Sequence, residues 1–296
     1  MYHHFGYIKR CETVPVTYPP QYQPQHPGIE SFMIPRPISE NPYYSGSGKL
    51  RNKAAIITGG DSGIGRAVAI AFAKEEADVV IVYLNEHGDA LETKNRVEQL
   101  GRKCLTIAGD IGDEKFCQYV VQKTMEAFGH LEILVNNAGE ATTQASISDI
   151  TPAQLKRTFQ TNIFSFFYLT QAAIPYLKTG SSIINTTSIA AYTGDEDAID
   201  YAASKGAIVS FTRSLALSVV YQGIRVNGVA PGPVWTPLIP SSLPPEIYAT
   251  WGSNTPMKRA AQPFELAPLY VYLASDDSSY VTGQILNIDG GTAING

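Results

Sequence analysis

Short apolar runs alternate with longer segments of helical periodicity along the chain from residue 53 onward. The apolar runs predict strands at 54–58, 78–84, 104–108, 131–135, 182–187, 224–230 and 284–288. The segments between them predict helices at 65–76, 89–100, 114–128, 151–177, 201–221 and 265–274. Strands that are apolar throughout are buried on both faces, as in a parallel sheet whose right-handed crossovers place helices on both sides. The pattern therefore predicts one α/β domain with a doubly wound, seven-stranded parallel sheet, for which 3-2-1-4-5-6 is the common strand order.

Residues 1–48 do not follow this alternation. They hold 8 of the 19 prolines and 3 of the 5 histidines, with tyrosines scattered between them. Proline fixes φ and removes a backbone donor, so we expect an irregular segment rather than a helix. Its aromatic residues favour an extended arm that lies in part on a folded surface, for example that of a neighbouring subunit. A flexible leader without function is the alternative. We therefore divide the chain into an arm at 1–48 and a folded domain at 49–296.

Composition and charge exclude several classes of protein. Apolar residues make up 44% of the 296 residues, which is enough to bury a sizeable core. The formal net charge of -5 gives no electrostatic reason to expect a nucleic acid or an anionic membrane as partner. We find no apolar run long enough for a membrane helix and no signal-peptide pattern. Cys11, Cys104 and Cys117 are far apart and form neither a disulfide framework nor a metal cluster, so we expect a cytoplasmic protein.

A glycine-rich sequence, T-G-G-D-S-G-I-G, stands at 58–65 between the first predicted strand and the first predicted helix. Glycine lets the backbone turn tightly and approach a diphosphate, while the helix N-terminus offers N–H groups and a positive dipole. No Gly-Lys-Ser/Thr follows, so a kinase-type phosphate loop is disfavoured. A plain strand-to-helix turn is the alternative, but the position favours a dinucleotide site.

A tyrosine and a lysine suited to proton transfer follow the fifth strand of the predicted sheet. Tyr201 and Lys205 are four residues apart, so they share one face of the predicted helix at 201–221. A nearby cation favours the phenolate and lowers the pKa of a tyrosine towards neutral pH. Such a tyrosine can exchange a proton with an oxygen while a hydride moves at the adjacent carbon. Ser188, at the end of the fifth strand, can hold that oxygen by a hydrogen bond. A surface tyrosine beside a solvated lysine is the alternative for Y-x-x-x-K alone.

The ordered set of motifs resembles the short-chain dehydrogenase/reductase family. The set comprises T-G-x-x-x-G-I-G, an Asp after the third strand, N-N-A-G at 136–139, an Asn in the long helix, Ser, Y-x-x-x-K and Pro-Gly, and it covers residues 50–296. The arm and the Asp61-Ser62 form of the glycine loop also resemble a bacterial subgroup of aldehyde reductases, glucose dehydrogenase-like enzymes and general stress proteins. The resemblance implies a Rossmann-type domain that transfers a hydride between NAD or NADP and a small carbonyl or alcohol. It also implies a homotetramer, with the helices at 151–178 and 201–221 packed across two-fold axes.

The resemblance assigns a role to each matching residue. Tyr201 would be the acid/base, and Lys205 would lower its pKa and bind the nicotinamide ribose. Ser188 would orient the substrate oxygen, and Asn162 would hold a water in the proton relay. The expected substrate contacts are Ser188, Tyr201 and Trp235. The expected cofactor contacts are Gly59, Asp61, Ser62, Gly63, Ile64, Gly65, Tyr83, Leu84, Glu86, Asp110, Ile111, Asn137, Ala138, Gly139, Tyr201, Lys205, Pro231, Gly232, Val234 and Thr236.

The choice between NAD and NADP depends on the end of the second strand. Relatives that prefer NAD commonly carry an Asp there to hold the ribose diol, whereas this chain has Tyr83. Relatives that prefer NADP often carry a basic residue before the middle glycine or after this strand, where this chain has Ser62 and Leu84. Glu86 can reach in as an acceptor for the diol or be merely solvated. The absence of a cation favours NAD, with use of both cofactors left open.

The sequence contains no motif for the other catalytic chemistries that we considered. Only His87 and His130 lie in the predicted domain, and both are expected at its surface. We find no Cys/His/acid cluster for zinc and no Gly-x-Ser-x-Gly for a hydrolase. The loop at 231–262 is rich in proline and aromatic residues and predicts a mobile lid over an aldehyde, ketone, alcohol or sugar-type substrate. A non-catalytic dinucleotide-binding sensor or scaffold on the same fold is the rival hypothesis.

Overall fold

The apolar runs between residues 54 and 288 form one parallel sheet. The computed structural model describes residues 7–9 and 13–293. The strands of the sheet are β3 (Ala54–Thr58), β4 (Asp78–Tyr83), β5 (Cys104–Ala108), β6 (Ile133–Asn136), β7 (Ser182–Thr186), β8 (Arg225–Pro231) and β9 (Ile285–Ile288). They pair in the order β5-β4-β3-β6-β7-β8-β9, and every pair is parallel. The expected strand order is confirmed, with a seventh strand at the edge and a change of direction between β3 and β6.

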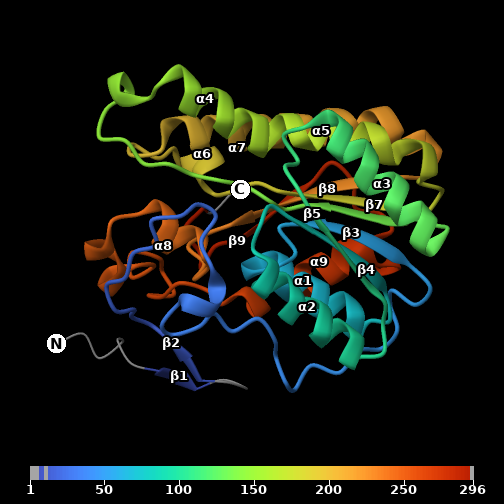
Figure 1. Cartoon of the computed structure of the whole chain (residues 1–296), viewed down its shortest axis with the longest axis horizontal. Coiled ribbons are helices and arrows are strands. Elements are labelled where there is room, and N and C mark those ends of the chain that lie inside the picture. Colours follow the sequence, from blue (N-terminus) through green and yellow to red (C-terminus); the bar gives the residue numbers. More distant parts are fainter. Residues whose placement is uncertain (1–6, 10–12, 294–296) are drawn as a thin grey trace.

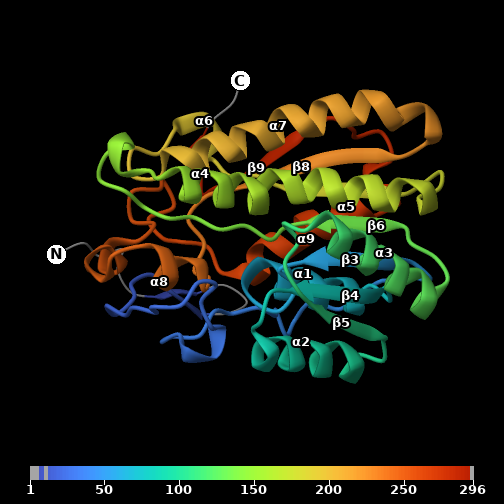
Figure 2. The ribbon, with the colours of Figure 1, turned by 45° about the horizontal axis from the view of Figure 1, so that its top comes forward.

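Helices cover both faces of this sheet, and α1, α2 and α9 lie on the face opposite to α3, α4, α5 and α7 (Figures 1 and 2). Their bounds are α1 (Gly63–Lys74), α2 (His87–Gln99), α3 (Glu114–Phe128), α4 (Pro152–Phe159), α5 (Ser165–Ala173), α7 (Ile199–Val219) and α9 (Pro263–Ala274), and α6 (Ala190–Thr193) and α8 (Leu238–Ser242) are short. Neighbouring strand residues point to opposite faces, so Ile57 packs with α1 and α9 whereas Ile56 packs with α3 and α5. Both faces bury apolar side chains, which explains the continuous apolar runs.

The segment predicted as one helix at 151–177 is interrupted in the structure. A π-helical turn, Gln160–Phe164, separates α4 from α5. Within it, the Asn162 side chain accepts a hydrogen bond from the Glu140 N–H (2.8 Å) and donates one to the Glu140 carbonyl (2.9 Å). We attribute the wider turn to this anchor on the loop after β6. Apolar periodicity does not reveal such a turn, because the backbone remains helical on both sides.

The described part of the arm packs on the domain of its own chain. Its strands β1 (Tyr7–Lys9) and β2 (Thr13–Pro15) form an antiparallel pair, and the segment that follows runs along the domain beneath α8 (Figure 2). Tyr18 stacks on Trp235 with ring centroids 3.9 Å apart, and the Trp235 indole N–H donates to the Pro35 carbonyl (2.8 Å). Tyr18 and Met33 of the arm share a small core with four residues of the loop at 231–262, namely Trp235, Ile239, Tyr248 and Ala260. The surfaces that hold the described arm are therefore the loop at 231–262 and the helices α1 and α2 of the same chain.

Two further expectations concern the chain as a whole. No helix among the described residues is long and apolar enough to cross a membrane. Cys104 and Cys117 are free and buried, and burial raises the pKa of each thiol to about 12. Both thiols are therefore protonated at neutral pH and unreactive. Cys11 lies outside the described residues.

Candidate active site

The carboxyl ends of the strands open into a large cleft. The cleft has a volume of about 630 Å³, and residues that directly follow β3, β4, β5, β6, β7 and β8 line it. An open α/β sheet binds its ligand at this edge, where the strand order changes direction. All of the predicted site residues except Gly65, Asn162 and Trp235 line this cleft. The sequence motifs, which are spread over nearly 180 positions, thus meet in one place.

The glycine loop forms one wall of the cleft and needs its glycines for two different reasons. Gly59 and Gly63 have positive φ values of +62° and +52°, which L side chains rarely adopt. Gly65 was expected to contact the cofactor, but it does not line the cleft. A Cβ at Gly65 would stand 1.9 Å from the Gly59 carbonyl oxygen, so this glycine lets the first turn of α1 pack against the loop.

An acidic pair occupies the cleft wall where the glycine loop meets the end of β4. Asp61 and Glu86 are 4% and 2% exposed. Burial, reinforced by the nearby Glu86 carboxylate, raises the pKa of Asp61 to about 7. One carboxylate oxygen of Glu86, Oε1, is buried without a hydrogen-bond partner in the described part of the chain. Glu86 is therefore not the solvated side chain that the sequence left as an alternative.

Ser188, Tyr201 and Lys205 line the cleft together, at the ends of β7 and α7. The Ser188 hydroxyl lies close enough to the Tyr201 phenol to act on its pKa, which it lowers. The Lys205 ammonium lies 5.5 Å from the centroid of the Tyr201 ring and donates to the Thr186 carbonyl (3.1 Å). A side chain at Gly139 would crowd this ammonium, since its Cβ would stand 3.2 Å from Lys205 Nζ. The arrangement places an acid, a hydrogen-bond donor and a cation in one wall.

The pKa of Tyr201 departs from the expectation. Burial raises the pKa of this phenol above its usual value, and the Asp195 carboxylate raises it further. Burial also lowers the pKa of Lys205 to about 8. The shift of the Tyr201 pKa thus runs opposite to the predicted lowering, because burial is its largest cause. Tyr201 is a proton donor at neutral pH.

Asn162 and Trp235 do not reach the cleft. Asn162 is fully buried, and its amide also donates to the Ser204 hydroxyl (3.0 Å), so its side chain braces the loop after β6 against α7. Trp235 is fully buried beneath Tyr18 of the arm. Its predicted contact with substrate is wrong, because the side chain points to the face of the loop that the arm covers. Trp251, from the same loop, lines the cleft instead.

Sequence reasoning missed several residues of the cleft wall. The arm contributes three of them, His26, Pro27 and Gly28, and the loop at 231–262 contributes Ser242. Ser242 Oγ, Trp251 Nε1 and Thr161 Oγ1 are buried polar atoms of cleft-lining residues without a partner in the described chain. The arm has no hydrophobic periodicity from which its position on the domain could be predicted. The proline-rich composition of the loop at 231–262 predicted that this segment borders the cleft, but not which of its side chains do so.

The chemistry of this cleft fits a dinucleotide. A left-handed glycine turn precedes the N-terminus of α1, an acid with a free buried acceptor lies at the end of β4, and Lys205 lies towards the other end of the wall. No group of His, Cys, Asp and Glu residues suited to a metal ion occurs among residues that the structure describes.

Comparison with known proteins agrees with the geometry. A family model described as enoyl-(acyl carrier protein) reductase matches residues 59–293. This chain belongs to the short-chain dehydrogenase/reductase family. It is 62% identical over 280 residues to the uncharacterized oxidoreductase YhxC of Bacillus subtilis, covering 95% of this chain and 98% of that protein. It is 48% identical over 287 residues to the glucose and ribitol dehydrogenase of Daucus carota, covering 94% and 98%. Both matches are long enough to include most of the arm, so the arm belongs to this branch of the family.

A solved structure of another short-chain dehydrogenase contains NADP. The short-chain dehydrogenase from Burkholderia cenocepacia J2315, in complex with NADP, superposes with a TM-score of 0.78 and 32% identity. The match covers 82% of this chain and 98% of that chain. Membership of the family and this neighbour support NAD(P) as the cofactor of this oxidoreductase. They give no support to the predicted preference for NAD.

Proposed function

We propose that this protein transfers a hydride between NAD(P) and a carbonyl or alcohol carbon, with Tyr201 as the acid/base. The observation that carries the proposal is the joint placement of Ser188, Tyr201 and Lys205 in a cleft whose other wall is the glycine loop. A sensor that only binds dinucleotides would have no need for a tyrosine that lines the cleft beside a serine hydroxyl and a buried lysine. When bound, NAD(P)H supplies the hydride for reduction and NAD(P)⁺ accepts it in oxidation.

The residues of the cleft perform the proton part of the reaction. In reduction, Tyr201 donates its phenolic proton to the carbonyl oxygen as the hydride reaches the carbon. The Ser188 hydroxyl, which lies beside the phenol, holds the same oxygen. The Lys205 ammonium stabilises the phenolate that is left behind. In oxidation, the phenolate takes the proton from the alcohol. Because the pKa of Tyr201 is raised, we propose that reduction is favoured at neutral pH.

The substrate end of the cleft supports a molecule with an apolar body and hydroxyl groups. Leu243 and Ile247 provide apolar surface, while Ser242 and Trp251 hold buried polar atoms that lack a partner. Because a buried polar atom gains from a hydrogen bond, these two groups favour a substrate that carries oxygen atoms beyond the reacting one. We propose small aldehydes, ketones and sugar-type compounds as substrates. A cytoplasmic location remains a proposal that the free thiols Cys104 and Cys117 support.

A steady-state assay tests the proposed function. The purified full chain is given NADH or NADPH with a panel of short aldehydes, ketones and aldoses, and NAD⁺ or NADP⁺ with the corresponding alcohols and polyols. We expect turnover of at least one carbonyl compound at neutral pH, visible as loss of reduced nicotinamide. Dinucleotide binding without any change in its redox state across the panel would favour a sensor or a redox-neutral reaction.

The pKa of Lys205 predicts how reduction depends on pH. The rate should stay level below pH 8 and fall as the pH rises through about 8, because neutral Lys205 no longer stabilises the Tyr201 phenolate. Oxidation needs the phenolate beside the charged ammonium, so its rate should rise with pH up to about 8 and level off above it. Pre-steady-state rates between about pH 6 and about pH 9.5 measure both effects. Lys205→Met should be slow and should lose the fall near pH 8, and an unchanged profile in that variant would contradict the assignment.

An apolar surface supports the proposed homotetramer. Leu155 and Phe164 at the α4–α5 junction are 45% and 42% exposed, and Leu217 on α7 is 80% exposed. If these helices pack across two-fold axes, Leu217→Glu should place a charge in the interface and yield a smaller species. Light scattering after size exclusion measures the mass. Leu91→Glu on α2, where the leucine is 55% exposed, is the matched control and should remain tetrameric. A monomeric wild-type protein would contradict the proposed assembly.

A further inference from the structure

Asp61 and Glu86 form an acidic site that the hydride-transfer chemistry does not use. Both side chains line the cleft and both are more than nine-tenths buried. Glu86 Oε2 accepts a hydrogen bond from the Asn85 N–H (3.1 Å), but Oε1 has no partner in the described part of the chain. A buried acceptor without a partner is costly, so this oxygen points to a ligand that brings a donor.

The position of the pair identifies that ligand as the adenosine ribose. An acidic residue that follows the glycine loop by about 20 positions, at the end of the second strand of a dinucleotide-binding fold, binds the ribose hydroxyls. Glu86 occupies this region, three residues beyond the end of β4. Asp61 belongs to the glycine loop itself, so the two acids border the same part of the cleft from different elements.

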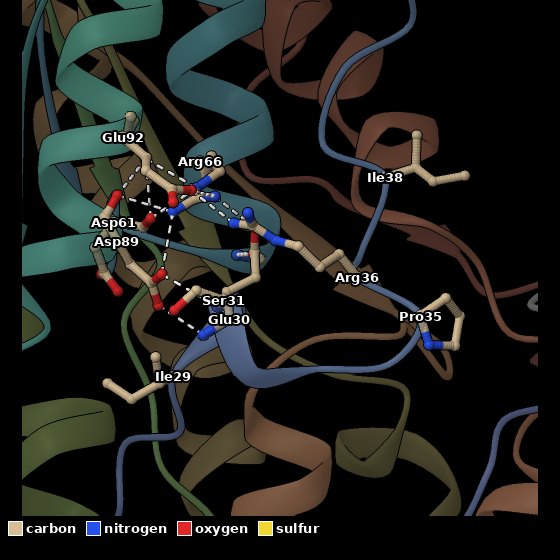
Figure 3. A network of polar contacts seen from close by, with 12 residues as sticks. Ile29, Glu30, Ser31, Pro35, Arg36, Ile38, Asp61, Arg66, Asp89 and Glu92 are labelled. Atoms are coloured by element: carbon tan, nitrogen blue, oxygen red, sulfur yellow. Dashed lines mark hydrogen bonds and ion pairs between the residues drawn. The ribbon is translucent and has the colours of Figure 1, made fainter.

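No cation in the described structure is free to offset these acids in the cleft. Arg157 lines the cleft, but its guanidinium is paired with Asp110 and Glu140. The Arg66 guanidinium contacts Asp61, but it donates to the main-chain oxygen (2.8 Å) and not to the carboxyl group. The rest of the Arg66 guanidinium contacts Glu30, Glu92, Thr93 and the Asp89 carbonyl, on the side of α1 that faces the arm and α2 (Figure 3). Arg66 does not line the cleft. A phosphate on the ribose would therefore meet two carboxyl groups and no guanidinium.

The charges around Asp61 determine when it ionises. Burial is the largest cause of its raised pKa of about 7, followed by Glu86 and, more weakly, by Asp89, while a hydrogen bond with Ser62 opposes them. Burial, followed by the Asp61 and Glu86 carboxyl groups, raises the pKa of the Tyr83 phenol. The titratable or charged groups near the pair are His26 and Glu30 of the arm, Arg66 of α1, Tyr83 of β4, and His87 and Asp89 of the α2 region. Burial lowers the pKa of His26, so this imidazole is neutral at neutral pH.

We infer that Asp61 sets the choice between NAD and NADP through its proton. With the carboxyl group neutral, Asp61 can donate a hydrogen bond to a phosphate oxygen on the ribose. With the carboxyl group charged, Asp61 and Glu86 accept hydrogen bonds from the ribose hydroxyls of NAD and repel a phosphate. The protein thus binds NADP better at low pH and discriminates against it at high pH. This inference rests on the proposed function, because it assumes that the cleft binds dinucleotides.

Fluorescence titrations of the full chain with NADH and with NADPH test the inference without turnover. The ratio of the two Kd values, NADPH over NADH, is measured from about pH 6 to about pH 8.5. In the wild type we expect the ratio to rise with pH by about tenfold or more, since like charges in contact cost several kcal/mol and each 1.4 kcal/mol is tenfold. The phosphate on the ribose itself gains charge near pH 6, so part of the pH dependence of the Kd ratio does not depend on Asp61.

Two variants and a control separate these contributions. In Asp61→Asn, only the part of the rise in the Kd ratio that comes from the phosphate should remain. At high pH the ratio of this variant should therefore be lower than that of the wild type. Glu86→Gln should move the rise to lower pH, because Glu86 is one of the groups that raise the pKa of Asp61. The exposed acid Asp149, outside the cleft, provides the control Asp149→Asn, which should behave as the wild type. A wild-type ratio that does not change with pH, or an equal slope in Asp61→Asn, would overturn the inference alone. Binding of neither dinucleotide would overturn the proposed function itself.

Discussion

Replacing Tyr201 with phenylalanine is expected to lower kcat by about 10²- to 10⁴-fold, the contribution of a positioned general acid. The variant loses the phenolic proton and keeps the ring, which lies in the cleft wall with the Lys205 ammonium 5.5 Å from its centroid. Binding of NADH and NADPH should change little, since most of the predicted cofactor contacts lie elsewhere in the cleft. Steady-state kinetics with a carbonyl substrate, together with fluorescence titration, measure the two quantities separately.

Tyr192 provides a matched control for this substitution. It is a partly exposed tyrosine on α6, near the cleft but absent from its wall, so Tyr192→Phe should leave kcat unchanged. Ser188→Ala should also lower kcat, because the reacting oxygen and the phenol lose a shared partner. A Tyr201→Phe variant with wild-type turnover would refute the proposed acid/base.

Replacing Arg66 with methionine should lower the free energy of unfolding by about 3–5 kcal/mol, as removal of one partner of a buried ion pair does. The Arg66 and Glu30 side chains are 7% and 1% exposed, and their Nη1 and Oε1 atoms lie 2.7 Å apart (Figure 3). Glu30 also accepts a hydrogen bond from the Gly63 N–H at the start of α1 (2.6 Å). Without Arg66, this carboxylate is left buried against the glycine loop, with the more distant Arg36 guanidinium (3.9 Å) as its remaining cation partner among the described residues. Urea denaturation at a fixed protein concentration measures the loss.

A double-mutant cycle distinguishes the ion pair from general damage to the fold. Glu30→Gln combined with Arg66→Met should cost less than the sum of the two single substitutions, because the second change removes the charge that the first leaves unpaired. Arg51→Met, at the exposed Arg51–Glu76 pair, is the control and should change stability little. Additive costs in the cycle would show that the arm and the glycine loop are not coupled through this pair.

Most of the fold could be predicted from hydrophobic patterning. The alternation of apolar runs and amphipathic segments corresponds closely to the observed sheet and helices, for example 54–58 to β3 and 114–128 to α3. The strand order was expected only as the common solution for a doubly wound sheet, and it was confirmed. The arm could not be placed, because its packing depends on single residues such as Tyr18 on Trp235 rather than on a repeating pattern. The π-helical turn at 160–164 depends on one tertiary contact of Asn162 and leaves no periodic signal.

The sequence predicted which residues line the site, but not how their side chains are oriented. Motif order and strand ends placed Asp61, Ser188, Tyr201 and Lys205 in one cleft, because parallel strands bring their carboxyl ends to the same edge. The direction of a loop side chain, as with Trp235, depends on what covers the loop. The ionisation of Tyr201 and Asp61 depends on burial, which spacing along the chain does not contain. Burial raises the pKa of Tyr201, which is opposite to the predicted direction. Burial also raises the pKa of Asp61, the acid on which the choice of cofactor is proposed to depend.

Transfer of deuterium from labelled cofactor to product tests the central proposal most directly. The purified protein is given NADH or NADPH with deuterium at the transferring carbon of the nicotinamide, together with a carbonyl compound that it turns over. Mass spectrometry of the alcohol then shows whether the label has moved. The account predicts one deuterium on the carbinol carbon with the wild type and almost none within the same time with Tyr201→Phe, although both bind the dinucleotide. An unlabelled product, or equal labelling by both proteins, would contradict it.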